Sequence, residues 1–290
     1  MNLRERASPM PVAAARVDTQ SWPRDGGAVP LRLHIFVPQD APPAAGYPVL
    51  YMLDGNAVAC HLEAAGLAVP VLVVAIGYDA RGETLKGARA FDYTPGVQGA
   101  PCPDPRAPQW CNGGADGLLD TIAGPIFSWV ASRYPVDANR QSLYGHSYGG
   151  LCALHGLSTR AAPMTAYIAA SPSLWWRDGV VADALGRSTH APAQVLLMAG
   201  EREAWHPRPV GRDGTPASRE GGRATLPAAQ TLAERLAQRP GWRVDFQAIT
   251  GATHHTMLAA SIAPALTFAY AALPRTALTV SGSEQERPTP

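Results

Sequence analysis

Charge is the first property that this chain has little of. Only 16% of its 290 residues are charged, the formal net charge is +1, and Lys86 is the only lysine. Proteins that bind nucleic acids carry basic residues clustered on one face, and this charge balance argues against such a face. We therefore expect a small-molecule partner and no nucleic-acid partner.

Long hydrophobic runs are also missing. No stretch approaches the roughly 18 apolar residues of a membrane-spanning helix. Residues 1–20 contain Arg4, Arg6 and Arg16 but no continuous apolar segment of the kind found in signal peptides. We expect no membrane span and a cytoplasmic location, with the periplasm as the alternative.

Cysteine is scarce, with four residues in the chain. Cys60 and Cys152 lie in apolar helical patterns and are predicted to be buried thiols. Cys102 and Cys111 flank a proline-rich stretch, and a disulfide between them would imply an oxidising compartment. The missing signal peptide favours free thiols. No Cys/His spacing is typical of a zinc site, so we expect no metal.

The order of apolar patterns predicts an α/β fold. Strand-like runs alternate with helical patterns, which is typical of a mostly parallel central sheet with helices on both faces. Continuous apolar runs predict central parallel strands, whereas the alternating pattern of the first strand suits an outer antiparallel one. Strands are expected over residues 31–37, 48–53, 70–77, 142–144, 166–170, 194–199 and 242–249.

Helical periodicity predicts helices over residues 118–134, 226–238 and 256–271. Together these elements predict a flexible N-terminal segment over residues 1–20, a single domain over residues 21–274 and a disordered tail over residues 275–290.

Two segments interrupt the alternation of strands and helices. Residues 78–117 and 202–223 are long and rich in Gly, Pro and Arg, and unstructured loops of that length in a domain are usually functional or disordered. Both are predicted to leave the carboxyl end of the sheet, where open α/β folds bind ligands.

The most informative motif is Gly145-His146-Ser147-Tyr148-Gly149, which lies between a strand-like run and a helical pattern. It is the G-x-S-x-G nucleophile elbow of the α/β-hydrolase fold in the right structural context. The turn is so tight that Gly145 and Gly149 are expected to be required as glycine. The motif predicts Ser147 as a nucleophile and the Tyr148 N–H as a donor to a developing oxyanion.

A nucleophilic serine needs a general base, and in this fold the order along the chain is serine, acid, histidine. The segment 251–257 follows the last predicted strand and contains His254 and His255. We favour His254, because His255 would begin the closing helix.

The acid is expected after the preceding strand, where Glu201 and Glu203 are the candidates. A carboxylate at this place would accept the histidine N–H and fix its tautomer. We prefer Glu203 slightly. The alternative is that both are solvent-exposed loop charges.

A second oxyanion donor is expected in the loop over residues 53–57, directly before a helical pattern. The main-chain N–H of Gly55 or Asn56 would point toward Ser147. Asp54 has the residue type of a helix cap, a role that is compatible with a main-chain donor beside it.

Five stretches have a more specific pattern than the elbow alone: residues 47–56, 89–95, 145–150, 170–176 and 200–203. Together they resemble the siderophore esterases that hydrolyse enterobactin- and salmochelin-type trilactones, in the esterase D-like group of α/β-hydrolases. The resemblance covers most of residues 30–270. It implies that Ser147 and His254 carry the chemistry and that Tyr148 and Asn56 supply oxyanion N–H groups, with Glu203 as the least uniform element.

The resemblance also implies a substrate: a cyclic or linear ester of catecholoyl-serine units, free or iron-loaded. Such a large aromatic anion suits cations and stacking surfaces, and Arg89, Trp175 and Trp176 are candidate substrate-binding residues. The alternatives are that at least one tryptophan packs in the core and that Arg89 pairs with Asp92. Trp110 is a candidate lid residue.

The sequence thus predicts a serine esterase that hydrolyses the lactone bonds of a catecholate siderophore such as enterobactin, without a metal or organic cofactor. The alternative is a general carboxylesterase or acyltransferase for small acyl esters. A non-catalytic ligand-binding relative is a third hypothesis, and it would require a broken set of catalytic residues.

Overall fold

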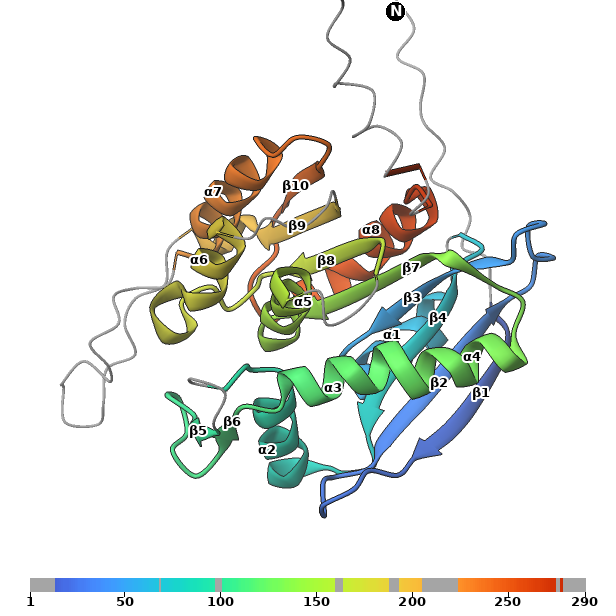
Figure 1. Ribbon diagram of the computed structural model, residues 1–290, viewed down its shortest axis with the longest axis horizontal. Helices are drawn as coiled ribbons and strands as arrows, with labels where there is room; N and C mark the ends of the chain where they lie inside the picture. Colours follow the sequence, from blue (N-terminus) through green and yellow to red (C-terminus); the bar gives the residue numbers. More distant parts are fainter. Residues whose placement is uncertain are drawn as a thin grey trace, which may run out of the picture.

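An eight-stranded sheet runs through the molecule in the order β1-β2-β4-β3-β7-β8-β9-β10. The computed structural model (Figure 1) describes residues 14–67, 69–96, 101–159, 164–187, 193–204, 224–274 and 277–278. The strands of this sheet are β1 (Ala14–Trp22), β2 (Leu31–Pro38), β3 (Tyr47–Met52), β4 (Leu72–Tyr78), β7 (Val136–His146), β8 (Ala166–Ala170), β9 (Gln194–Gly200) and β10 (Arg243–Ile249).

The sheet is parallel from β4 to β10, and only β1 and β2 run antiparallel to their neighbours. This confirms the predicted mostly parallel α/β architecture. Every residue of β3, β4, β8 and β9 is buried, because helices cover both faces of these strands. β2 alternates more nearly between buried and half-buried residues, as its sequence pattern predicted.

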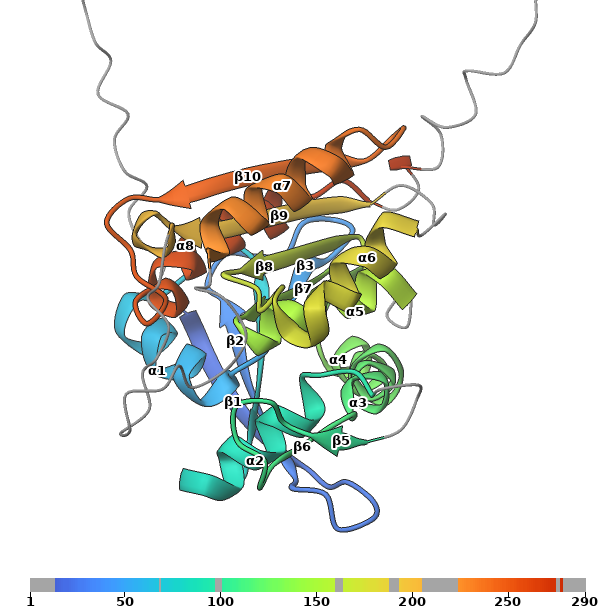
Figure 2. The same ribbon diagram turned by 90° about the vertical axis from the view of Figure 1, so that its left-hand side faces the viewer.

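Helices form a layer on each face of the sheet (Figure 2). On one face, α1 (Gly55–Ala65) and α8 (Met257–Ala271) pack on side chains such as Leu50 and Tyr144. The opposite face carries α3 (Ala115–Thr121), α4 (Phe127–Arg133), α5 (Tyr148–Thr159), α6 (Val180–Arg187) and α7 (Thr225–Ala237). The helix predicted over residues 118–134 contains a π-helical turn, Ile122–Ile126, around Pro125, which lacks the N–H of a regular helix.

The predicted flexible segment over residues 1–20 is wrong for residues 14–20, which belong to β1. This strand is polar, but it lies at the sheet edge and pairs along its length with β2. Asp18 accepts a hydrogen bond from the Tyr134 hydroxyl at 2.7 Å, and Trp22 packs edge-on against Trp129 with 6.2 Å between ring centroids. Edge pairing and these two contacts order a sequence that has little apolar signal of its own.

The segment over residues 78–117 is not a structureless loop. It contains α2 (Gly82–Asp92) and a small hairpin of β5 (Cys102–Pro103) and β6 (Cys111–Asn112). Of the second predicted insertion, 202–223, residues 205–223 lie outside the described residues. Most of the predicted tail, 275–290, also lies outside them, and the domain boundaries stay predictions.

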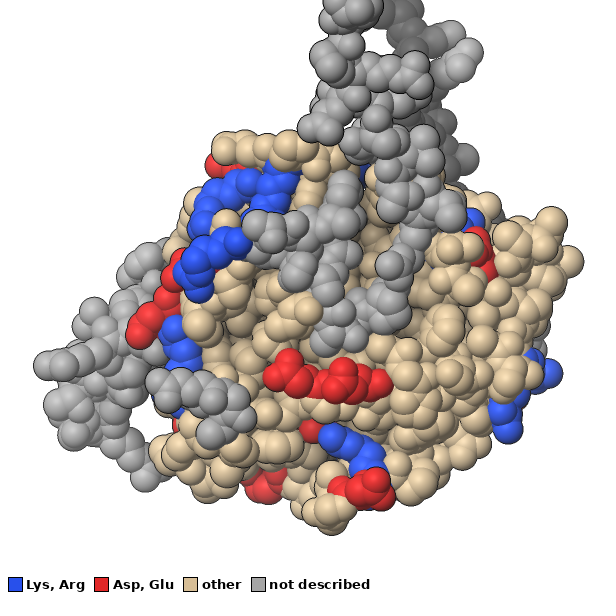
Figure 3. Space-filling model, viewed as in Figure 1, with Lys and Arg blue, Asp and Glu red and all other residues tan. Residues whose placement is uncertain are grey.

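The cysteines are all free thiols. Cys152 is buried, as expected, whereas Cys60 is exposed on α1 because its position faces away from the sheet. Cys102 and Cys111 lie in the paired strands of the hairpin without a disulfide. No helix among the described residues has the length and apolar character needed to cross a membrane. In the view of Figure 3, basic and acidic residues form small separate groups on a largely uncharged surface.

An ion pair anchors α2 to the edge of the sheet. Arg24, in the turn between β1 and β2, donates two hydrogen bonds of 2.5 and 2.8 Å to the buried carboxylate of Asp92. The hydroxyl of Tyr78, at the end of β4, donates a third at 2.9 Å. Asp92 therefore joins α2 to both the β1–β2 turn and β4.

We expect Arg24→Met to destabilise the protein by about 3 kcal/mol, because it leaves the buried Asp92 carboxylate without its cation. Urea denaturation measures the change in free energy of unfolding. The matched control is Arg32→Met, which breaks an exposed pair with Asp79 and is expected to cost less than about 1 kcal/mol. Equal losses in the two variants would contradict a structural role for the Arg24–Asp92 pair.

Candidate active site

Ser147 occupies the sharp turn between β7 and α5, with a left-handed backbone at φ 58°. The turn brings the backbone of residue 145 against the carbonyl of Gly149, so a Cβ at Gly145 would collide with it. A Cβ at Gly149 would lie 3.4 Å from the nearest atom of Leu53, which is ordinary contact. The expectation that both glycines are required is therefore wrong for Gly149, because only Gly145 faces the crossing backbone.

His254 is the histidine that contacts Ser147. It lies in the turn between β10 and α8, and its Nε2 is 3.0 Å from the Ser147 hydroxyl oxygen. The ring of His255 is exposed and lies 6.4 Å from that of His254. Of the two candidate bases, His254 is therefore the one within hydrogen-bonding distance of the Ser147 hydroxyl.

Glu203 completes a continuous hydrogen-bonded chain. Its buried carboxylate lies 2.8 Å from Nδ1 of His254 and also accepts hydrogen bonds from the Ser171 hydroxyl at 2.5 Å and the Gly200 N–H at 3.0 Å. Burial would raise the pKa of Glu203, but the hydrogen bonds from His254, Ser171 and Gly200 outweigh it and lower this pKa below 4.5. Glu203 is therefore an ionised acceptor for the His254 N–H.

Glu201 has a different role from Glu203. It is exposed and accepts hydrogen bonds from the Gly251 N–H at 2.9 Å and the Thr250 hydroxyl at 3.3 Å. These contacts brace the turn that precedes His254, and they leave Glu203 as the carboxylate next to the histidine ring.

The two predicted oxyanion donors lie in the first turns of helices. Tyr148 begins α5 and Asn56 is the second residue of α1, and main-chain N–H groups in the first turn of a helix can point toward an anion. The side chain of Asn56 bonds both main-chain groups of Tyr78, at 2.7 and 2.9 Å. A Cβ at Gly55 or Gly77 would collide with the other segment, so these two glycines allow the contact. The loop is fixed, and the oxyanion roles of Tyr148 and Asn56 stay predictions.

Arg89 forms an ion pair with Asp54, not with Asp92. Its guanidinium donates two hydrogen bonds of 2.5 and 2.9 Å to the Asp54 carboxylate and a third of 3.2 Å to the His146 carbonyl. Burial acts to lower the pKa of Arg89, but Asp54 outweighs it and raises this pKa. Asp54 precedes α1, but its side chain makes no capping hydrogen bond. Its carboxylate accepts hydrogen bonds from Arg89 instead.

This arrangement links the two segments that carry the predicted oxyanion donors. Asp54 directly precedes Gly55, and His146 directly precedes Ser147, so a single guanidinium from α2 holds both. The local sequence contains no signal for this link, because Arg89 and Asp54 are far apart along the chain.

His146 has a role that the sequence analysis did not predict. Its Nε2 lies 3.1 Å from the main-chain carbonyl of His254, and the two rings are 5.0 Å apart. Because a carbonyl only accepts, this nitrogen carries the hydrogen. Burial and the neighbouring His254 lower the pKa of His146 to about 4, so the ring is neutral at pH 7. His146 therefore holds the backbone of His254 as an uncharged donor.

The two candidate tryptophans occupy different environments. Trp176 is only 1% exposed, and its Nε1–H donates to Asn112 at 3.2 Å, so its predicted role in substrate binding is wrong. Trp175 is half-buried, lies 6.1 Å from the Tyr148 ring and lines a cavity of about 600 Å³. Arg89, Asn56 and His254 line a smaller cavity of about 290 Å³. Trp110 packs against the core beside α2, and its role as a lid stays a prediction.

The hydrogen-bonded chain has the arrangement needed for nucleophilic catalysis. The serine hydroxyl can pass its proton to His254 Nε2, while Glu203 holds the opposite ring nitrogen in its protonated form. Within the described residues, no group of His, Cys, Asp and Glu side chains could hold a metal ion.

Comparisons with known proteins identify relatives of this chain. Residues 29–210 match the family described as "Putative esterase". The ferri-bacillibactin esterase BesA of Bacillus subtilis is 31% identical over 259 residues, which cover 81% of this chain and 84% of that protein. The apo-salmochelin esterase of Escherichia coli O6:H1 is 35% identical over 150 residues, 49% of this chain and 46% of that protein.

The similarity extends to solved structures. The siderophore hydrolase EstB from Aspergillus nidulans superimposes with a TM-score of 0.65 at 28% identity, over 89% of this chain and 95% of that chain. The fold is therefore shared with an enzyme of similar length.

We expect Glu203→Gln to lower kcat for ester hydrolysis by about a thousandfold or more, because an amide N–H facing Nδ1 would favour the wrong tautomer of His254. Initial rates of p-nitrophenyl ester hydrolysis at saturating substrate measure this loss of kcat. The matched control is Glu201→Gln, which is expected to keep kcat within about twofold, since Glu201 touches only the turn. A larger loss in Glu201→Gln than in Glu203→Gln would contradict the assignment of the acid.

The depressed pKa of His146 predicts a pH-dependent stability. The folded-state pKa is about 4 and the ordinary value is 6.5, so the unfolded chain binds the proton more readily in between. The contribution of neutral His146 to the free energy of unfolding is fully present above pH 6.5. It falls by up to about 3 kcal/mol as the pH drops toward 4. His146→Phe should remove this part of the pH dependence, measured by urea denaturation at pH 7 and pH 4.5. The same pH dependence in both proteins would show that His146 is not the buried neutral group.

Proposed function

Because this chain belongs to the Putative esterase family and is a serine hydrolase of carboxylic esters, we propose that it hydrolyses the ester bonds of a catecholate trilactone siderophore such as enterobactin. Its relatives support this substrate class: one is a ferri-bacillibactin esterase, another an apo-salmochelin esterase, and a solved structure is a siderophore hydrolase. Cleavage of the trilactone would weaken its hold on iron and so release the metal.

The observation that carries the proposal is the hydrogen-bonded chain from Ser147 through His254 to Glu203. The three residues come from three separate connections at one end of the sheet, so their alignment is a property of the fold. A non-catalytic binding protein has no need of this alignment, which therefore favours an enzyme.

In the proposed mechanism, Ser147 attacks a lactone carbonyl while His254 takes its proton. The carbonyl oxygen becomes an oxyanion, and the main-chain N–H groups of Tyr148 and Asn56 stabilise it. The carbon–oxygen bond then breaks as His254 protonates the leaving alcohol, which gives an ester between Ser147 and the acyl group. A water molecule, deprotonated by His254, hydrolyses this ester and restores the serine.

Glu203 and Arg89 have supporting roles in this mechanism. The ionised Glu203 stabilises the imidazolium of His254 as it forms. Arg89 was expected to bind the substrate, but its hydrogen bonds to Asp54 and His146 favour a positioning role, in which it keeps the two oxyanion segments together. Trp175 is half-buried and lines the larger cavity, so it keeps its proposed role beside a catechol ring.

We propose a cytoplasmic location for this activity. Four free thiols support it, since a pair such as Cys102 and Cys111, on adjacent strands of one hairpin, stays reduced in that compartment. The proposed reaction needs no nucleic acid, metal or organic cofactor.

The test is chromatography of enterobactin after incubation with the protein, in the apo and ferric forms, following linear trimer, dimer and monomer. We expect wild-type protein to produce linear species from at least one form. Ser147→Ala should reduce the rate by about a millionfold, to a level indistinguishable from the blank.

A panel of p-nitrophenyl esters with short acyl chains is the comparison for substrate class. Hydrolysis of these esters with no cleavage of either siderophore form would refute the siderophore assignment and favour a general carboxylesterase. Undiminished siderophore hydrolysis by Ser147→Ala would refute the serine mechanism.

A further inference from the structure

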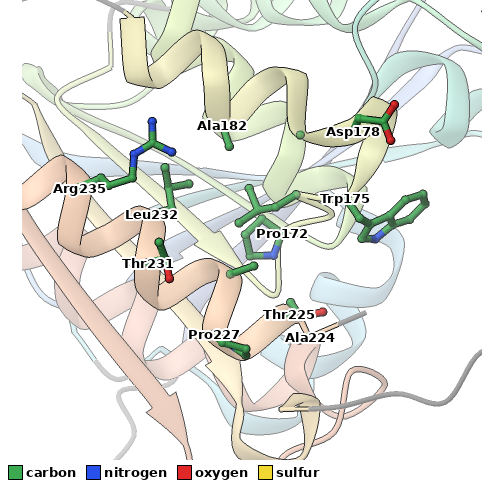
Figure 4. Close-up of a pocket in the computed structure, with 13 residues that line it drawn as sticks. Pro172, Trp175, Asp178, Ala182, Ala224, Thr225, Pro227, Thr231, Leu232 and Arg235 are labelled. Carbon is green, nitrogen blue, oxygen red and sulfur yellow. The ribbon is translucent and has the colours of Figure 1, made fainter. Parts of the chain in front are cut away.

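A cavity of about 600 Å³ lies between α6 and α7, beside the segment that follows β8 (Figure 4). Figure 4 shows Ala182 on α6 and Leu232 on α7 on opposite sides of it. Its lining is largely apolar and includes Pro172, Leu174, Trp175, Ala182, Pro227 and Leu232. The size and character are those of a small-molecule site.

The wall of this cavity is joined to the nucleophile through Ser173. Pro172 and Leu174 line the cavity, and Ser173 between them contacts Ser147. The Ser173 N–H donates to the Ser147 carbonyl at 3.1 Å, and the two hydroxyl oxygens are 3.3 Å apart. A group in the cavity is therefore separated from the reacting serine by one residue.

Strained backbone lies beside the cavity, at Asp178 and the residue before it. Arg177 and Asp178 both have left-handed conformations, with φ of 47° and 54°. Such conformations cost of order 1 kcal/mol or more for residues other than glycine, and they persist where neighbouring contacts impose them. Here Arg177 donates to the Cys102 sulfur at 3.0 Å and to the Pro103 carbonyl at 2.9 Å, which leaves Asp178 lining the cavity.

The mechanism assigns the two cavities to different halves of an ester. His254 protonates the leaving alcohol, so the alcohol lies on the His254 side. The cavity on that side measures about 290 Å³ and is lined by His254, His255 and Leu258. The acyl half then lies on the other side of the serine, where Ser173 contacts the Ser147 hydroxyl.

We propose that the cavity between α6 and α7 is the acyl subsite and that it selects an aromatic acyl arm. The proposal rests on the esterase function given above and adds the location of the arm. Trp175 offers a stacking surface at the end nearer Tyr148, and the largely apolar lining suits an aryl ring.

The test fills the cavity from its two walls with Ala228→Trp on α7 and Ala182→Trp on α6. Two substrates share the same alcohol and differ in the acyl arm: p-nitrophenyl acetate and p-nitrophenyl N-benzoylglycinate. The measured quantity is the ratio of kcat/KM for the aryl ester to kcat/KM for the acetate. We expect each variant to lower this ratio by about tenfold or more, through a higher KM, because the indole occupies the space of the aryl ring and leaves that ring exposed to water.

The matched control is Ala237→Trp, an exposed position on α7 outside the cavity, which should keep the wild-type ratio. Urea denaturation midpoints show that each variant is folded. A ratio within a factor of two of wild type in folded Ala228→Trp and Ala182→Trp would overturn the proposal.

The two proposals fail separately. Loss of aryl selectivity in the variants of a protein that leaves enterobactin intact would support the acyl subsite and refute the siderophore function. Enterobactin cleavage by the wild-type protein, with an unchanged kcat/KM ratio in the variants, would support the siderophore function and refute the acyl subsite.

Discussion

The arrangement at the carboxyl end of the sheet depends on one close backbone crossing, where β7 turns into α5. The turn forces Ser147 into a left-handed conformation that costs an ordinary residue about 1 kcal/mol or more. Main-chain hydrogen bonds retain it: the Ser147 N–H donates to Ala170 at 2.9 Å, and its carbonyl accepts from Ser173. The serine is thereby fixed to β8 and to the segment beyond it. The neighbouring strand and the cavity wall then have defined positions relative to the hydroxyl.

A second close approach fixes the acid relative to the base. Gly200 ends β9, and a Cβ there would collide with the carbonyl of Ala252. That carbonyl also accepts a hydrogen bond from the Arg202 N–H at 3.0 Å. The loop that carries Glu203 is therefore joined through its backbone to the loop that carries His254. Serine, histidine and acid are held by main-chain contacts between neighbouring strand ends, and their side chains have little freedom left to lose.

The core of this arrangement could be predicted from sequence, because its signals are local. The buried strands have continuous apolar runs, and the elbow has glycine where the chain must cross itself. Partners far apart in sequence could not be predicted. Arg89 has carboxylates near it in sequence, yet it pairs with Asp54, which only the packing of α2 brings close. Trp175 and Trp176 have the same local pattern, but Trp176 is the buried one and its Nε1–H donates to Asn112, which is distant in sequence. β1 was missed because its order comes from pairing with β2 and not from its own hydrophobicity.

The Arg89 link has a consequence for how this chain can vary. Connections between strands and helices usually tolerate inserted or deleted residues, since little else depends on their length. Here the connection after β4 carries α2, and the Arg89 guanidinium on this helix is bonded both to Asp54 before α1 and to His146 in the serine turn. A single residue added to α2 before Arg89 would rotate this side chain by about 100° around the helix and away from both partners. Length in this part of the chain is thus as constrained as in the core, and a connection that resembles a variable surface insertion behaves as part of the framework.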